Sequence, residues 1–452
     1  MRSVWPSPDR PFAPARLPFF YGWAVLGLGT LAVAFSIPGQ TMGVSVFTDS
    51  LLEATGLSRL QLSTAYLFGT LASGLCLPFG GRLLDRRGAR LVGGGAALLL
   101  ALVLVALSFV GQLTPRLTES STSTRVVQVF ALMTVGFAVL RFSGQGMLTL
   151  TGRTMMARWF DRRRGLVAAV SGAFVSFAFS LAPLVLLAWI AVSGWRGAWR
   201  EMAIALVCMA VIASLFFRDS PEECGLQLDG GPTPHGDTPV APEPDPKSGI
   251  AAHAPTARRD TTHAEALASR SFWLLTLVIA ADSMMSTALT FHIVDLGAES
   301  ELSEFEAVGI FVPITIISVA LGFLVGWLVD RQPILRLVQA MALLEIVMFA
   351  AAGHLDNPML RAVTIAAWGC VGGFYAPLTA AALPRLFGRR HLGAIAGSMT
   401  MVLVLASALG PAYLAWFRAA TGSYRTGLHA SIAIPLLLLA ASLVVRRRGR
   451  PR

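Results

Sequence analysis

Residues 81–90 read GRLLDRRGAR and separate two long apolar runs, at about 60–81 and 91–112. Within this segment an Asp–Arg pair, Asp85 and Arg86, is followed by Gly88 and Arg90. The first part of the segment recurs as GWLVDR, residues 326–331, again directly after an apolar run. A motif that returns in the same context indicates that the chain is built from two related halves.

The composition of the chain indicates a protein that crosses a membrane many times. Of its 452 residues, 55% are hydrophobic and only 13% are charged, whereas about 25% are charged in an ordinary soluble domain. This excludes a typical cytosolic enzyme and a disordered chain. Segments in lipid must satisfy their own backbone hydrogen bonds, so we expect the apolar runs to be helices. We predict twelve, at about 19–45, 60–81, 91–112, 127–150, 166–192, 198–217, 272–296, 306–329, 335–353, 360–383, 392–417 and 426–445.

Two further repeats support a division into six helices plus six. The segment FDRR at 160–163 recurs as FGRR at 387–390, and Ala182-Pro183 recurs as Gly410-Pro411. Between the halves lies a stretch rich in Pro and Gly, which cannot bury a core. We therefore predict an all-α polytopic membrane protein with two pseudo-symmetric six-helix bundles. Its parts are a tail at 1–18, a first bundle at 19–217, a flexible linker at 218–271, a second bundle at 272–445 and a basic tail at 446–452.

The charge pattern predicts how the chain lies in the membrane. Most of the 36 Arg and Lys residues fall in segments that would share one side with both termini, and cytoplasmic loops collect such residues. We expect both termini to be cytoplasmic, in a bacterial inner membrane. The N-terminus lacks the pattern of a removable signal peptide. The four cysteines form no CxxC pair, so neither a disulfide framework nor a zinc site is indicated.

The loop Gly81-x-x-x-Asp85-Arg86-x-Gly88-x-Arg90 resembles the loop signature of the major facilitator superfamily. Tyr21-Gly22-Trp23 and the segment RWFDRRRG at 158–165 resemble its bacterial monocarboxylate and oxalate–formate antiporter-like branch. The resemblance implies a secondary active transporter that moves a small organic solute, a carboxylate anion in this branch, by alternating access. It also implies that the loop is a conformational clasp. The clasp residues are Gly81, Asp85, Arg86, Gly88 and Arg90, with Asp330 and Arg331 in the repeat.

Two charged residues are predicted near the middle of the membrane. Arg141 lies about 18 Å along a helix from Arg153, and Asp282 lies about 16 Å from Ser271. A charge at this depth is costly and needs a polar cavity or a partner. We expect Arg141 to anchor an anionic substrate and Asp282 to face it and bind a proton. For each, a purely structural role is the alternative.

Other polar and aromatic residues are candidates for the same cavity. Pro38 and Gly39 are expected to break the first helix and to present Gln40. Trp368 stands at the repeat position of Arg141, so we expect one charged and one aromatic wall. The remaining candidates are Gln145, His292, Tyr375, Tyr66, Ser283 and Ser286. By the topology of the resembled family, Glu345 is expected to be peripheral.

Several functional alternatives remain open. We expect the protein not to be an enzyme and to have no cofactor, metal or nucleic-acid partner. It is expected to be a monomer that binds a small molecule and lipid, with protons as a further candidate ligand. Transport would be driven by a proton gradient or by anion exchange, since no ATP-binding GxxxxGK[ST] motif is present. One alternative is a proton-antiport exporter of drugs or metabolites. An alternative of another class is a nutrient sensor in the membrane that transports nothing.

Overall fold

The computed structural model describes residues 9–113, 122–160, 163–231, 261–387 and 392–448. Within these residues the secondary structure is helical. The first half contains α1 (Gly22–Phe35), α2 (Thr41–Ser45), α3 (Thr48–Thr55), α4 (Arg59–Ser108), α5 (Val110–Leu113), α6 (Thr122–Arg141), α7 (Thr149–Trp159) and α8 (Arg164–Phe216). The second half contains α9 (His263–Ala268), α10 (Arg270–Glu299), α11 (Glu304–Gly309), α12 (Phe311–Arg331), α13 (Ile334–Ala352), α14 (Pro358–Pro377), α15 (Leu383–Phe387), α16 (Leu392–Thr421), α17 (Tyr424–Ser431) and α18 (Ala433–Arg448).

The described residues cross a membrane-thick slab twelve times. Ten of their helices are long and apolar enough to span a bilayer. One of these, Val170–Phe216, bends at Gly194, whose φ of 66° is non-helical, and it therefore makes two crossings. The shorter α1 adds the last one. The prediction of an all-α protein with twelve spanning helices is confirmed.

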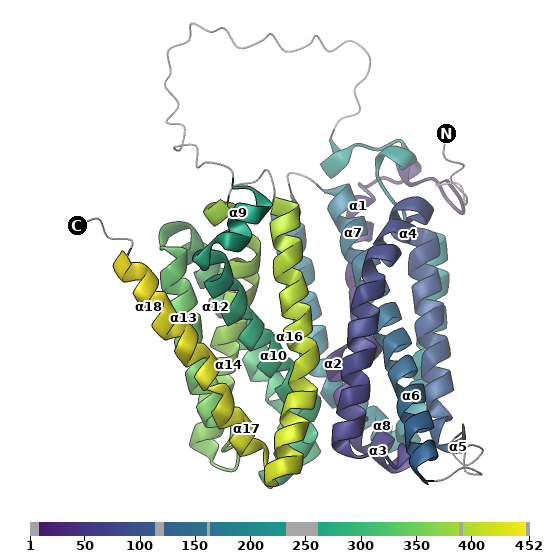
Figure 1. Ribbon diagram of the computed structural model, residues 1–452. Helices are drawn as coiled ribbons and strands as arrows, with labels where there is room; N and C mark the ends of the chain where they lie inside the picture. Colours follow the sequence, from purple (N-terminus) through teal and green to yellow (C-terminus); the bar gives the residue numbers. More distant parts are fainter. Residues whose placement is uncertain (1–8, 114–121, 161–162, 232–260, 388–391, 449–452) are drawn as a thin grey trace, which may run out of the picture.

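The helices form two bundles that stand side by side (Figure 1). The first lobe, drawn in purple and blue, holds α1 to α8, and the second lobe, in green and yellow, holds α10 to α18. α1 begins and α18 ends at the same end of the molecule, which we call the terminal face. α3, α5 and α17 lie at the other end, the opposite face. Both lobes interrupt their fourth crossing with a π-helical segment, at Phe142–Leu148 and at Leu378–Ala382.

Large apolar side chains point away from both lobes. Val192, Leu75 and Met359 are each at least 75% exposed. A soluble protein covers such surface, whereas acyl chains solvate it. The pattern of exposure therefore agrees with a bundle surrounded by lipid.

The structure describes parts of the predicted linker and of the predicted tails. Thr262 caps α9, and its hydroxyl and the Glu265 side chain form a capping box. At the other end of the chain, Phe12 packs against Tyr21, with ring centroids 5.6 Å apart. Of the predicted flexible linker, 218–271, residues 232–260 lie outside the described residues, as do the ends of both tails.

Gly88 marks the turn between the second and third crossings. Its φ of 81° lies in the left-handed region, and the next backbone amide, that of Ala89, donates to the Asp219 carboxylate. Arg158 also pairs with Asp219, at 3.4 Å. Burial raises the pKa of Asp219, while the Ala89 amide and the arginines act in the opposite direction. Asp219 therefore ties the predicted loop signature to the end of α8.

We expect Gly88→Ala to destabilise the protein markedly. A Cβ at Gly88 would lie 2.1 Å from the Asp219 carboxylate, and the left-handed φ costs an L-residue about 1–2 kcal/mol on its own. Asp219 cannot swing aside without losing the Ala89 and Arg158 contacts. The apparent melting temperature in detergent should fall by several degrees, with loss of at least about 2 kcal/mol.

Gly81→Ala is the matched control within the same motif. A Cβ at Gly81 meets nothing within 4 Å, and alanine favours the helix by up to about 1 kcal/mol over glycine. Its melting temperature should equal or exceed that of the wild type. Equal losses in the two variants would contradict this account of the turn.

Candidate functional site

A polar cavity of about 400 Å³ lies between the two lobes. The first lobe supplies three of its lining residues, and the second lobe supplies the rest through α10, α14, α16 and the second π-helical segment. Most of the lining side chains carry hydroxyl, amide or charged groups. They are Thr70, Arg141, Gln145, Asp282, Ser283, Ser286, Thr287, Tyr375, Thr379, Thr400, Leu403, Val404 and Ser407.

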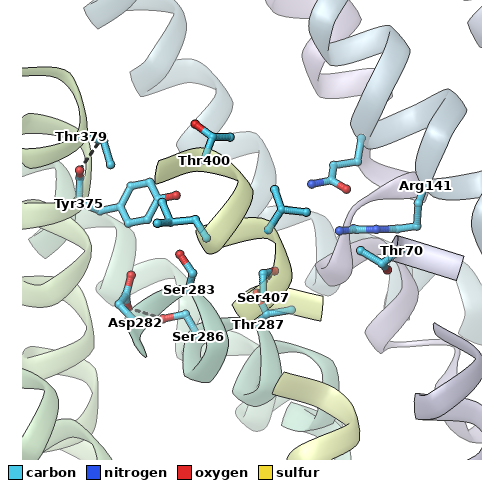
Figure 2. Close-up of a pocket in the computed structure, with 13 residues that line it drawn as sticks. Thr70, Arg141, Asp282, Ser283, Ser286, Thr287, Tyr375, Thr379, Thr400 and Ser407 are labelled. Atoms are coloured by element: carbon cyan, nitrogen blue, oxygen red, sulfur yellow. Dashed lines mark hydrogen bonds between the residues drawn. The ribbon is translucent and has the colours of Figure 1, made fainter. Parts of the chain in front are cut away.

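Arg141 forms the charged wall of this cavity (Figure 2). The side chain is only 2% exposed, and one terminal nitrogen donates to the Gly39 carbonyl at 3.1 Å. The guanidinium also lies 5.2 Å from the centre of the Tyr66 ring, while its Nε has no hydrogen-bond partner in the described part of the chain. Among the side chains that the structure describes, no carboxylate lies within 4.0 Å of it. The cation is thus buried, held in place and without a counter-ion among these side chains.

The sequence around Gly39 explains how Arg141 is held. As predicted, the first crossing breaks: α1 ends at Phe35, and a 3₁₀ turn covers Ile37–Gly39. The break leaves the Gly39 carbonyl without a helical partner. A Cβ at Gly39 would lie 2.6 Å from the Leu140 carbonyl and 2.8 Å from the Gly144 Cα. Two glycines therefore let the broken helix approach the π-helical segment that follows Arg141, a type of distortion frequent at functional sites.

The opposite wall carries Asp282 and a group of hydroxyls. Asp282 is 5% exposed and accepts a hydrogen bond of 2.7 Å from Ser286. Figure 2 shows Asp282, Ser283 and Tyr375 on one side of the cavity and Arg141 on the other. Asp282 and Arg141 line one cavity but form no ion pair within 4.0 Å. Space for a small ligand separates the two charges.

Three of the seven predicted cavity residues do not line this cavity. Gln40 donates to Ser36 and Thr149, at 2.9 and 3.4 Å. Trp368 is buried and packs edge-on against Phe311, with ring centroids 5.7 Å apart. The aromatic residue that reaches the cavity is instead Tyr375, two helical turns further along the chain.

His292 is the third predicted residue that lies elsewhere. It is 1% exposed, and its Nε2 lies 2.8 Å from the Pro411 carbonyl. A carbonyl oxygen only accepts, so Nε2 carries the hydrogen, and Nδ1 accepts from the Tyr424 hydroxyl at 3.1 Å. With both nitrogens bonded inside the second lobe, His292 has no free group for a ligand.

The predicted clasp is described only in part. Arg90 donates to the Phe217 and Leu215 carbonyls, at 3.0 and 3.3 Å, and so caps the end of α8 within the first lobe. Arg86 is exposed, and Arg331 donates to the Trp327 carbonyl of its own helix at 3.1 Å. The side chains of Asp85 and Asp330 lie outside what the structure describes. The clasp therefore stays a prediction.

An ion-pair network that the sequence reasoning missed joins the lobes at the opposite face. Arg59, at the start of α4, pairs with Asp49 of its own lobe and, at 3.1 Å, with Asp295 of α10 in the second lobe. Arg418 lies 3.8 Å from both Asp295 and Glu299. Each of these side chains is an ordinary loop-flanking charge in the sequence, so only the three-dimensional arrangement could reveal their pairing.

We expect Arg59→Ala to favour conformations in which the lobes separate at the opposite face. The Arg59–Asp295 pair is partly buried, with side-chain exposures of 20% and 18%, so its loss should shift the equilibrium by about 1 kcal/mol, or about fivefold. Spin labels at Glu53 and Glu301, exposed positions in different lobes, would report the shift as a longer distance population.

Arg425→Ala provides the control for this experiment. Arg425 pairs with Asp356 at 2.9 Å, but both residues belong to the second lobe, and their side chains are 42% and 50% exposed. Its loss should leave the distance distribution unchanged. An identical shift in both variants would show that the Arg59 pair does not hold the lobes together.

The architecture and the cavity define a class: a membrane transporter of two helical lobes with its polar site between them. The family model of the Major Facilitator Superfamily matches residues 18–411. The chain belongs to this family. Family and fold indicate a transporter rather than an enzyme. No curated protein matches the chain.

Solved structures of transporters share the fold at low sequence identity. A bacterial homologue of the human lysosomal transporter Spinster, inward-facing and unoccupied, gives a TM-score of 0.61 at 15% identity and covers 93% of this chain and 95% of its own. The occupied form gives 0.65 at 13%, covering 94% and 97%. The nucleoside transporter NupG gives 0.62 at 12%, covering 93% and 99%. These likenesses concern the fold alone.

Proposed function

We propose that this transporter carries a small organic anion whose carboxylate binds Arg141. The observation that carries the proposal is a buried guanidinium on the cavity wall with no counter-ion among the described side chains. Arginine pairs with carboxylates through two parallel hydrogen bonds. A bound anion would complete the hydrogen bonding of Arg141 and neutralise a charge that is costly at this depth.

The size and lining of the cavity support a small, partly polar solute. A volume of about 400 Å³ is at the lower end of ligand pockets. Across the cavity from Arg141, hydroxyls such as Ser283 and Tyr375 offer hydrogen bonds to the remainder of a substrate. This arrangement suits an anion with one carboxylate and a hydroxyl or keto group better than a bulky drug.

Asp282 is the group proposed to couple transport to protons. It lines the same cavity as Arg141, so the charge of a bound substrate would influence proton binding at Asp282, and the charge of Asp282 would influence substrate binding. A neutral Asp282 admits an anion more readily than a charged one does. Anion exchange is the alternative source of energy, and it needs Arg141 but not Asp282.

Uptake by proteoliposomes tests the proposal. Purified protein would be reconstituted and offered acetate, lactate, pyruvate, formate and oxalate, with and without a pH gradient. We expect saturable uptake of at least one acid. Uptake of neutral sugars or nucleosides with none of the acids would overturn the anion assignment, while acid uptake that ignores the pH gradient but responds to an internal anion would favour exchange.

A further inference from the structure

Glu345, in the middle of α13, is a second buried acid near the cavity. The side chain is fully buried, and neither carboxyl oxygen has a hydrogen-bond partner among the described residues. Glu345 does not line the cavity, in keeping with its expected peripheral place, but it is buried within the second lobe. A buried carboxylate without partners is strongly disfavoured, whereas the protonated, neutral form is tolerated.

Glu345 and Asp282 lie at the same depth on neighbouring helices. α10 and α13 both begin at the terminal face and pack against each other. Asp282 is 12 residues from the start of α10 and Glu345 is 11 residues from the start of α13, or about 18 and 17 Å along their helices. Asp282 lines the cavity, and Glu345 is not among its lining residues.

Other charged or titratable groups lie on the helices that surround α13. α13 packs against α10, α14, α17 and α18. Besides Asp282, these helices carry Arg270, His292, Asp295, Glu299, Arg361, Cys370, Tyr375, Tyr424, Arg425, His429 and, with undescribed side chains, the arginines at 446–448. Among the described side chains, none of these forms a hydrogen bond or ion pair with Glu345. No cation within bonding distance holds this carboxyl in its charged form.

We propose that Glu345 is a proton-binding site in its own right, which exchanges its proton with the cavity through Asp282. A proton taken from cavity water by an Asp282 carboxylate passes to Glu345 when that group is charged, which leaves Asp282 ionised and able to bind another proton. The proton leaves by the reverse route. The pair thus stores one proton out of contact with substrate. This inference deepens the proposed function, because it rests on proton coupling through Asp282.

Infrared spectroscopy of reconstituted protein without substrate tests the protonation directly. At pH 7 exposed carboxyl groups are ionised, so a carbonyl band of a protonated carboxyl that shifts in D₂O reports buried acids. We expect the wild type to show this band, Glu345→Gln to lose its Glu345 component, and Asp282→Asn to shift that component. Glu53→Gln, the same change at an exposed position of the first lobe, should leave the spectrum unchanged.

Isotope labelling of glutamate assigns the infrared band to Glu345 without a substitution. In wild-type protein containing glutamate with a ¹³C carboxyl group, the Glu345 component should move to lower frequency, and any Asp282 component should not. A band that survives Glu345→Gln unchanged, or one without any ¹³C-glutamate shift, would overturn the proposal. A Glu345 band that is indifferent to Asp282→Asn would overturn the exchange. Neither result depends on the substrate, so a failed uptake screen with a positive spectrum would reject only the proposed function.

Discussion

Arg141→Gln is expected to abolish high-affinity uptake of the transported acid. The substitution removes the one cation on the described cavity wall, and losing a buried, hydrogen-bonded charge pair costs about 3 kcal/mol, or roughly a hundredfold in Kd. Arg141→Lys keeps the charge but not the planar fork, so we expect an intermediate loss of about tenfold. Uptake against acid concentration in proteoliposomes measures both.

Arg125→Gln is the control for this change. Arg125 stands on the same helix, α6, near its other end, and does not line the cavity. Its apparent affinity should equal that of the wild type. If both Arg141→Gln and Arg125→Gln transport the acid with wild-type affinity, Arg141 is not the anion site and its role is structural.

Asp282→Asn is expected to uncouple accumulation from the pH gradient. A gradient of one pH unit supplies about 1.4 kcal/mol per proton, enough for about tenfold accumulation with one proton per substrate. An asparagine accepts no proton, so the gradient should no longer drive accumulation, although exchange of labelled for unlabelled acid should persist. The measurement compares both activities in the same proteoliposomes.

The exposed Asp356→Asn substitution provides the comparison. Asp356 lies in the second lobe outside the cavity and pairs with Arg425, so its loss should leave pH-driven accumulation intact. Full accumulation in Asp282→Asn would place the proton site elsewhere. Loss of both accumulation and exchange would instead indicate that Asp282 binds the substrate itself.

Counting residues predicts how far along its helix a side chain lies, because helical rise is constant. Arg141 and Asp282 were placed near mid-membrane by counting residues, and both line the same central cavity. The break in the first helix was also predictable, since Pro38 and Gly39 disrupt any helix. Local chemistry and regular geometry are sufficient for such features.

Features that depend on how helices rotate against each other could not be predicted. Trp368 was assigned to the cavity from its repeat offset to Arg141, but the π-helical segment directly follows Arg141 in one lobe and follows Pro377 in the other. The distortion therefore stands at a different place relative to the repeat in each lobe, and Tyr375, not Trp368, lines the cavity. The burial of Glu345 depends on helix rotation in the same way.

Contacts between distant loops were also beyond the sequence. Asp219 follows α8 in a polar segment that resembles any helix end, and only the folded chain brings it to the Gly88 turn. The Arg59–Asp295 pair joins residues of different lobes. For such pairs, residue type is compatible with many partners, and tertiary packing selects one.

Ligand-induced thermal stabilisation of purified protein tests the anion site most directly. Each acid of the uptake panel would be compared with its primary amide, which has nearly the same shape but no charge. We predict that at least one acid raises the melting temperature of the wild type while its amide does not, and that Arg141→Gln loses this preference. Equal stabilisation by acid and amide, or an undiminished acid effect in Arg141→Gln, would contradict the role given to Arg141.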